Sequence, residues 1–135
     1  MTFYVDASVQ VAVRKALASV RDDVLYAGGP GAPKENTQDR HWLKTAGENG
    51  WVVLKRDKRI RSRPGERDAL IAAGVRTFCL TGGGNYTRWQ VLELLAIRWR
   101  RIEQVADNVP GPYIYSVTWD GVRELTLAGV SRPRK

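Results

Sequence analysis

The sequence contains one cysteine and one histidine, and this scarcity removes several classes of protein. Cys79 alone cannot form an internal disulfide, and with His41 as the sole histidine the Cys/His zinc arrangements are excluded. No stretch approaches the ~20 consecutive apolar residues that a membrane span needs. Because Asp6 interrupts the N-terminus and no long apolar run follows it, we expect no signal peptide and a reducing, cytoplasmic location.

Acidic residues are also few relative to basic ones. Lys and Arg total 22 against 14 Asp and Glu, which gives a net charge of +8. Such an excess favours phosphate-rich partners, chiefly nucleic acid, although basic charge can also serve solubility alone. With 135 residues and 43% apolar content, the chain is expected to form a single domain over residues 1–128, followed by a basic tail over 129–135.

Apolar runs and helical periodicities alternate along the chain. Strands are predicted at residues 2–5, 24–26, 51–54 and 75–80, and a hairpin at 113–118 and 122–127 that turns at Asp120–Gly121. Helices are predicted after Ser8, after Thr37, from Pro64, and after Asn85 or Thr87. This alternation is typical of an α/β fold with a mostly parallel sheet and helices on both faces.

Three acids fall where such a sheet binds its ligands. Asp6 directly follows the first strand, Asp39 lies in the first turn of the helix after the second, and Asp57 comes three residues after the third. Ligands of α/β sheets sit beyond the carboxyl ends of the strands. Carboxylates gathered there repel one another unless a cation joins them, and Mg²⁺ or Mn²⁺ is the hard ion that suits oxygen ligands. The alternative is that Asp6 and Asp39 only complement helix dipoles.

A basic segment adjoins the third acid. It contains Lys55, Arg56, Lys58, Arg59, Arg61 and Arg63 and predicts a track for nucleic-acid phosphates, with a solvated face as the alternative. Asn85, after a run of three glycines, either lines the same pocket or caps a helix. The glycines lack the Lys-Ser/Thr that would make them a P-loop. Trp89 and Trp119 are the tryptophans least clearly assigned to the core, and they could stack on bases or dock a partner.

Four segments in order, FYVDAS, TQDRHWL, GWVVLKRDKRIRSRPGERDAL and VRTFCLTGGGN, resemble the PIN-domain superfamily, and most of all its VapC-type toxins. The resemblance runs over residues 3–117. It implies a three-layer α/β/α sandwich, Mg²⁺- or Mn²⁺-dependent endoribonuclease activity as the toxin of a toxin–antitoxin pair, and inhibition by a cognate antitoxin. By position, Asp6, Asp39 and Asp57 match the acidic residues of the family. A homodimer is a further expectation.

The chain departs from that family in two places. Lys55 stands two residues before the third acid, where Ser or Thr is common, and no acid follows closely behind Asp57, so we assign the auxiliary catalytic position to Glu66. These departures leave open a PIN-like fold that binds nucleic acid without cutting it. A phosphotransfer receiver domain would need adjacent N-terminal acids and a Lys after a late strand, and neither pattern is present.

Overall fold

The computed structural model describes residues 1–56, 64–81 and 85–127. Its strands are β1 (Phe3–Val5), β2 (Val24–Tyr26), β3 (Val52–Lys55), β4 (Arg76–Leu80), β5 (Tyr113–Thr118) and β6 (Gly121–Leu125). Its helices are α1 (Val11–Val20), α2 (Asp39–Asn49), α3 (Pro64–Ala73) and α4 (Arg88–Asn108). None of the helices in these described ranges has both the length and the apolar character to cross a membrane.

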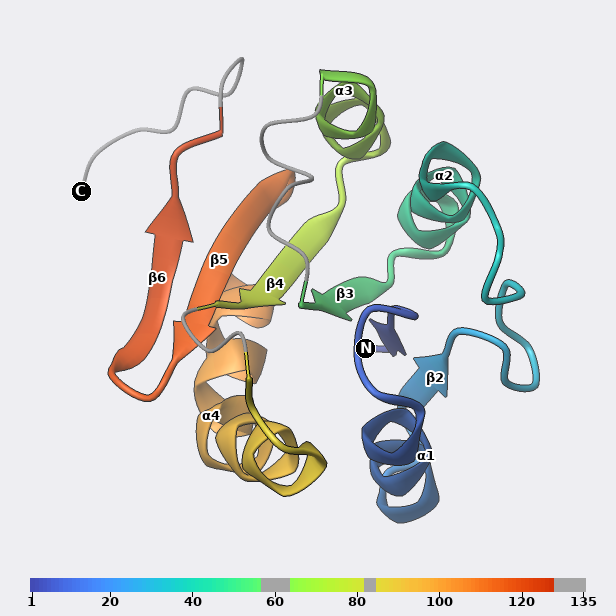
Figure 1. The fold of residues 1–135 in the computed structure, drawn as a ribbon. Coiled ribbons are helices and arrows are strands. Elements are labelled where there is room, and N and C mark those ends of the chain that lie inside the picture. The colour runs from blue at the N-terminus through green and yellow to red at the C-terminus, as the bar shows by residue number, and fades with distance from the viewer. Residues whose placement is uncertain (57–63, 82–84, 128–135) are drawn as a thin grey trace.

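The strands form one sheet in the order β2-β1-β3-β4-β5-β6 (Figure 1). The first five strands are parallel, and β6 pairs antiparallel with β5. Helices α1 and α4 cover one face of the sheet, and α2 and α3 cover the other (Figure 1). The predicted three-layer α/β/α sandwich with a C-terminal hairpin is therefore confirmed.

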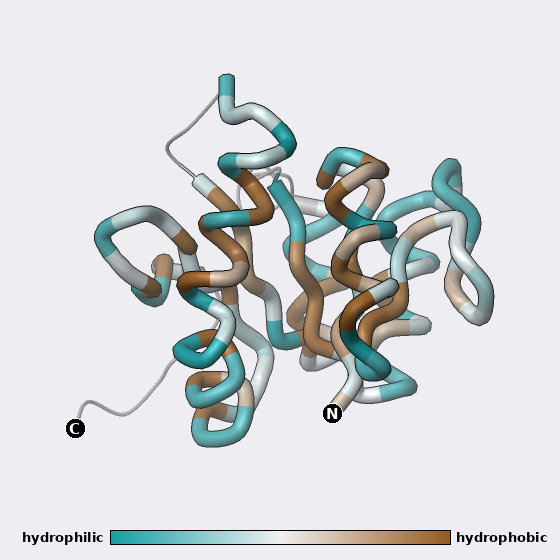
Figure 2. Tube along the Cα trace, turned by 90° about the horizontal axis from the view of Figure 1, so that it is seen from below, coloured by the Kyte–Doolittle hydropathy of each residue, from teal (hydrophilic) through white to brown (hydrophobic). Residues whose placement is uncertain are grey.

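Each face of the sheet has its own apolar core. Side chains of successive strand residues point to opposite faces, so Phe3 and Val5 pack under α1 and α4, whereas Tyr4 packs under α2 and α3. Along the tube in Figure 2, brown apolar stretches alternate with teal hydrophilic ones, and the helices carry both. Because β1 and the first three residues of β3 are buried on both faces of the sheet, both segments are continuous apolar runs in the sequence.

The start of α1 differs from the prediction. Ser8 was expected to cap this helix, but α1 begins at Val11 after Gln10, which makes no side-chain cap. The Ser8 hydroxyl instead donates to the Asp6 carboxylate at 2.6 Å. The Ser8 Oγ atom, which would accept a helix amide if it were a cap, accepts from the Arg56 amide at 3.0 Å instead, so the residue serves the acid and not the helix.

Of the other predicted helix caps, Thr87 is confirmed and Thr37 is not. Thr87 caps α4 as expected, and with Gln90 it forms a reciprocal capping box. The expected cap Thr37 is one residue too early, since Gln38 precedes α2, and the Gln38 side chain makes no capping bond. In its place Asp39 supplies a negative charge to the first turn, where the helix dipole favours one.

The parallel topology brings the carboxyl ends of β1 to β5 to one side of the sheet, here called the carboxyl edge. The four helices also begin at this edge, because each follows a strand that ends there. The amide of Asp6 donates to Leu54 O at 2.9 Å, which continues the β1–β3 ladder one residue further. Asp6 therefore lies opposite Lys55 in the register, on the face covered by α2 and α3.

Candidate active site at the carboxyl edge

Asp6 is a nearly buried carboxylate held by the turn that follows β1. Its side chain is 9% exposed, and Oδ2 accepts hydrogen bonds from the Ser8 amide at 3.1 Å and the Ser8 hydroxyl at 2.6 Å. The Ser8 hydroxyl in turn accepts from the Arg56 amide at 3.0 Å, which ties this turn to the end of β3. No residue that the structure describes donates to Oδ1. One oxygen of Asp6 is thus fixed, and the other remains available to a ligand.

Asp39, the first residue of α2, is fixed in a similar way. Trp42 Nε1 donates to Asp39 Oδ1 at 2.8 Å, and the Trp42 side chain is 3% exposed. The ring centroids of Trp42 and Tyr4 are 5.5 Å apart, so the indole is packed against the sheet. Asp39 is half-buried in the first turn of α2. Its Oδ2 accepts no bond from the described part of the chain.

The two acids act on one common group, the hydroxyl of Tyr4. Burial is the largest cause that raises the pKa of Tyr4, and the negative charges of Asp6 and Asp39 raise it further, while Arg14 opposes them. Tyr4 itself is 1% exposed and stacks on Trp51 with ring centroids 5.4 Å apart. Since both carboxylates lie within electrostatic reach of the same hydroxyl, β1 and the start of α2 contribute to one acidic region.

Lys55 places a positive charge in this region. The side chain ends β3 opposite Asp6, and the residue is 3% exposed. Its Nζ lies 5.6 Å from the centroid of the Trp42 ring, a cation–π contact. It forms an ion pair with none of the carboxylates in the described ranges. Lys55 is thus a buried ammonium beside the two acids, and it does not belong to an exposed basic surface.

Arg14 is a buried residue of the site that sequence reasoning missed. Its guanidinium is almost wholly buried and donates to Val9 O at 2.8 Å, to Ala27 O at 2.6 Å and to Glu35 Oε1 at 2.6 Å. It thereby ties α1 to the loop between β2 and α2, which leads to Asp39. The one available signal was the spacing, since Arg14 lies three residues before Leu17 on the buried stripe of α1.

The remaining predicted site residues divide between described and undescribed parts of the chain. Asp57, Lys58, Arg59, Arg61 and Arg63 lie outside the described residues. Arg56 is half-buried at the end of β3, Glu66 is half-buried in the first turn of α3, and Asn85 is exposed before the α4 cap. Within the ranges searched, which exclude Asp57, no three His, Cys, Asp or Glu side chains come together as a metal cluster.

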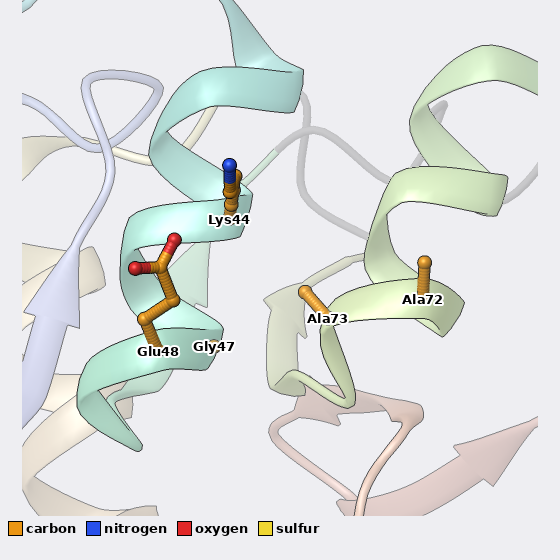
Figure 3. Close-up of a pocket in the computed structure, with 5 residues that line it drawn as sticks. All are labelled: Lys44, Gly47, Glu48, Ala72 and Ala73. Carbon is orange, nitrogen blue, oxygen red and sulfur yellow. The ribbon is translucent and has the colours of Figure 1, made fainter.

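A surface hollow of about 510 Å³ lies elsewhere, between α2 and α3 (Figure 3). It is lined by Lys44, Gly47, Glu48, Ala72 and Ala73. The helices approach so closely here that a Cβ added at Gly47 would stand only 2.7 Å from the Ala73 Cβ. These lining residues come from the second half of α2 and from the last two residues of α3, away from the carboxyl edge where both helices begin, so the hollow is separate from the acidic region.

The described donors fit a hard divalent ion. Asp6 and Asp39 each keep one carboxylate oxygen that accepts no bond from the described residues, and Mg²⁺ and Mn²⁺ prefer such oxygens. The other oxygen of each is held by a hydrogen bond of the kind that orients metal ligands, from Ser8 and from Trp42. The arrangement can therefore provide two oriented anionic ligands at the carboxyl edge.

Comparison with known proteins points to a family. A model of the PIN-like domain family matches residues 1–82, a stretch that contains Asp6, Asp39 and Asp57. Among curated proteins, the chain is similar to the putative ribonuclease VapC45 of Mycobacterium tuberculosis (strain ATCC 25618 / H37Rv), with 29% identity over 83 residues. That alignment covers 62% of this chain and 59% of the relative, less than two thirds of its length. No solved structure matches the chain.

Proposed function

The chain belongs to the family of PIN-like domains, and on that premise we propose that it is a divalent-metal-dependent endoribonuclease. The observation that carries the proposal is that Asp6 and Asp39 both lie at the carboxyl edge, and that in each a hydrogen bond holds one carboxylate oxygen while the other accepts no bond from the described residues. Asp57 is proposed as the third ligand on its sequence position, and Glu66 as the auxiliary acid. Mg²⁺ or Mn²⁺ bound there would lower the pKa of a bound water and neutralise charge on the phosphate.

Each residue of the acidic region has a distinct role in this proposal. Ser8 and Trp42 hold Asp6 and Asp39 in fixed orientations, so that little reorganisation is needed when the ligands engage. The buried Lys55 ammonium offsets the mutual repulsion of the carboxylates and can donate to a phosphate oxygen placed against them. The nearly buried position of Asp6 limits bulk water around the reacting phosphate.

The basic segment supplies the grip on the RNA backbone. Arg56, Lys58, Arg59, Arg61 and Arg63 are proposed to contact phosphates on either side of the scissile one, with Asn85 lining the same edge. The net charge of +8 supports this role, since it attracts a polyanion even though the site itself is acidic. Binding should therefore weaken steeply as salt rises.

We further propose that the protein acts in the cytoplasm as the toxin of a toxin–antitoxin pair, with a cognate antitoxin as its inhibitor and a homodimer as its assembly. Support comes from the PIN-like family match and from the similarity to the putative ribonuclease VapC45. A basic segment next in sequence to an acidic region would suit an inhibitor that presents acidic groups to the segment and a cation to the acids.

A cleavage assay tests the enzymatic proposal. Purified protein is incubated with labelled single-stranded RNA in Mg²⁺, in Mn²⁺ and in EDTA, alongside Asp6→Asn and the control Asp22→Asn. Asp22 is exposed at the opposite edge of the sheet. We expect metal-dependent cleavage by the parent chain and by Asp22→Asn, and its loss in Asp6→Asn. Equal cleavage by the parent and Asp6→Asn would refute the assigned site.

A second candidate function is binding of nucleic acid without cleavage. The observation that favours it is Lys55, because a buried ammonium opposite Asp6 can balance the acids without any metal. The same assay separates the two candidates: RNA binding that persists while no metal supports cleavage would identify a binding module.

A further inference from the structure

Two large aromatic side chains stand exposed at the carboxyl edge. Trp89, the second residue of α4, is 69% exposed, and Trp119, in the turn between β5 and β6, is 39% exposed. The other three tryptophans belong to the core and are at most 9% exposed. Both rings lack the burial that normally stabilises a side chain of this size, so both are accessible to a ligand at one edge of the sheet.

A chain of contacts leads from the acidic region to these rings. Gln10, four residues beyond Asp6, donates from Nε2 to Tyr86 O at 3.3 Å. The Tyr86 ring packs edge-on against Trp119 with centroids 6.2 Å apart, and Trp89 follows Tyr86 by three residues. The carboxyl edge is four strands wide between β1 and β5, about 14 Å at the usual strand spacing. The acids and the tryptophans therefore line one continuous edge.

Trp119 is held in position from α4. The Arg98 guanidinium donates from Nε to Thr118 O at 3.0 Å and from Nη2 to Trp119 O. These bonds join the β5–β6 turn to the helix whose first turn carries Trp89. The fold thus fixes the backbone that carries each tryptophan before any ligand arrives, and the Tyr86 ring also contacts the Trp119 ring, which reduces the ordering cost of binding.

The charge around the two rings favours a polyanion. Arg88, next to Trp89, is exposed, and Arg56 lies at the end of β3 on the same edge. Asp120 is the acid of the β5–β6 turn, and the chain as a whole carries +8. Flat aromatic faces with neighbouring arginines are the arrangement that binds single-stranded nucleic acid, since every base offers a π-face to stack.

We propose that Trp89 and Trp119, here called the aromatic platform, stack unpaired bases of the RNA strand whose backbone enters the acidic region. This inference rests on the proposed function, because it takes RNA as the substrate. It adds a specificity: the strand must be unpaired beside the cleavage point, since a base inside a duplex is already stacked on its neighbours. Arg98 is the positioning residue that holds Trp119.

The test measures binding without cleavage. A fluorescently labelled single-stranded RNA of about 12 nucleotides, within the range of known single-strand sites, is titrated with Asp6→Asn protein in EDTA and followed by anisotropy. Trp89→Ala and Trp119→Ala are added separately to that background, with Trp89→Phe as the conservative variant. Ile97→Ala is the matched control, since Ile97 is 60% exposed on α4, about two turns beyond Trp89. Circular dichroism confirms that each variant is folded.

We expect each Trp→Ala change to raise the Kd by about fivefold to 150-fold, the range that loss of one stacked base gives. Trp89→Phe should retain most of the affinity, and Ile97→Ala should match its parent. An abasic strand of the same length should bind the parent and the Trp→Ala variants equally. A duplex RNA should be equally insensitive to the tryptophans.

Three outcomes would overturn the aromatic platform. The first is an unchanged Kd for the Trp→Ala variants. The second is a loss of affinity on Trp→Ala substitution that is as large for the abasic strand as for the normal strand. The third is self-association in sedimentation that disappears in Trp89→Ala, which would make this edge an interface between copies of the chain. The result is independent of catalysis. If the parent chain cleaves no RNA in any metal, the proposed function fails while the stacking result still stands by itself.

Discussion

Ser8→Ala removes the link between Asp6, the acid that follows β1, and the end of β3. The Ser8 hydroxyl donates to Asp6 Oδ2 at 2.6 Å and accepts from the Arg56 amide at 3.0 Å. Loss of one charged and one neutral hydrogen bond would cost up to about 4 kcal/mol in a dry interior. Because Ser8 is half-buried and water can replace part of both bonds, we expect a stability loss of about 2 kcal/mol.

The larger effect should fall on the metal. Asp6 would keep its bond from the Ser8 amide but lose the shorter bond from the hydroxyl, so the carboxylate would be less well oriented. Removal of such an orienting partner typically weakens metal affinity by about 10- to 100-fold. We therefore expect the Mn²⁺ concentration for half-maximal RNA cleavage to rise by that factor, with kcat at saturating Mn²⁺ changed much less.

The assay is a titration of initial cleavage rate against Mn²⁺ for the parent chain, Ser8→Ala and Ser19→Ala. Ser19 is the matched control, because its hydroxyl also makes one hydrogen bond, to Ala16 O at 2.8 Å, but on the exposed side of α1. The orienting role of Ser8 would be refuted if Ser8→Ala left the half-saturating Mn²⁺ concentration unchanged, or if Ser19→Ala raised that concentration by the same factor.

Two further predictions concern stability. Gly47→Ala should lower the free energy of unfolding, measured by urea titration, by about 1–3 kcal/mol, because the new methyl group would meet the Ala73 Cβ and carbonyl. Gly65→Ala is the control, because a Cβ at Gly65 meets nothing within 4 Å, and it should not destabilise the chain. Asp23→Asn should destabilise by at most about 1 kcal/mol at neutral pH, since the hydrogen bond from Arg21 lowers the pKa of Asp23 and both side chains are about one third exposed. Because the pKa of Asp23 in the folded chain is below its ordinary value of 3.8, the stabilisation is present above pH 3.8 and is lost as pH falls through the folded pKa. The unfolding free energies of the parent and Asp23→Asn should therefore become equal in acid. A difference that does not depend on pH would contradict the assignment, and Asp22→Asn serves as the control.

The fold was predictable because its strongest signals are local. The strand at Val24–Tyr26 was predicted with the observed bounds, and the apolar run before Lys55 marked a strand buried on both faces. The helical spacing of Leu92, Leu95, Trp99, Ile102 and Ala106 predicts the buried stripe of α4, and the last four of these residues are buried. Leu92 is only half-buried, and α4 also buries Val91 and Leu94. A helix that packs against both a sheet and another helix buries a wider face than one stripe, and the sequence period alone does not give that width.

The site was predictable only in part, for reasons that depend on tertiary contacts. The parallel topology gave Asp6 and Asp39 their common edge, because strand ends and helix starts follow from chain order. The burial of Lys55 and Arg14 was not foreseen, since such side chains are rarely buried without partners from other elements. Their partners, the Trp42 ring and the carbonyls of Val9 and Ala27, become neighbours only in the folded chain.

The most direct test of the central claim is anomalous diffraction at the manganese edge from crystals grown with Mn²⁺. We expect a peak about 2.0–2.6 Å from one carboxylate oxygen of Asp6 and one of Asp39, with Ser8 and Trp42 still bound to the other oxygens. The absence of any peak at the carboxyl edge in metal-soaked crystals, with Asp6 and Asp39 each engaged by a lysine or arginine instead, would contradict it.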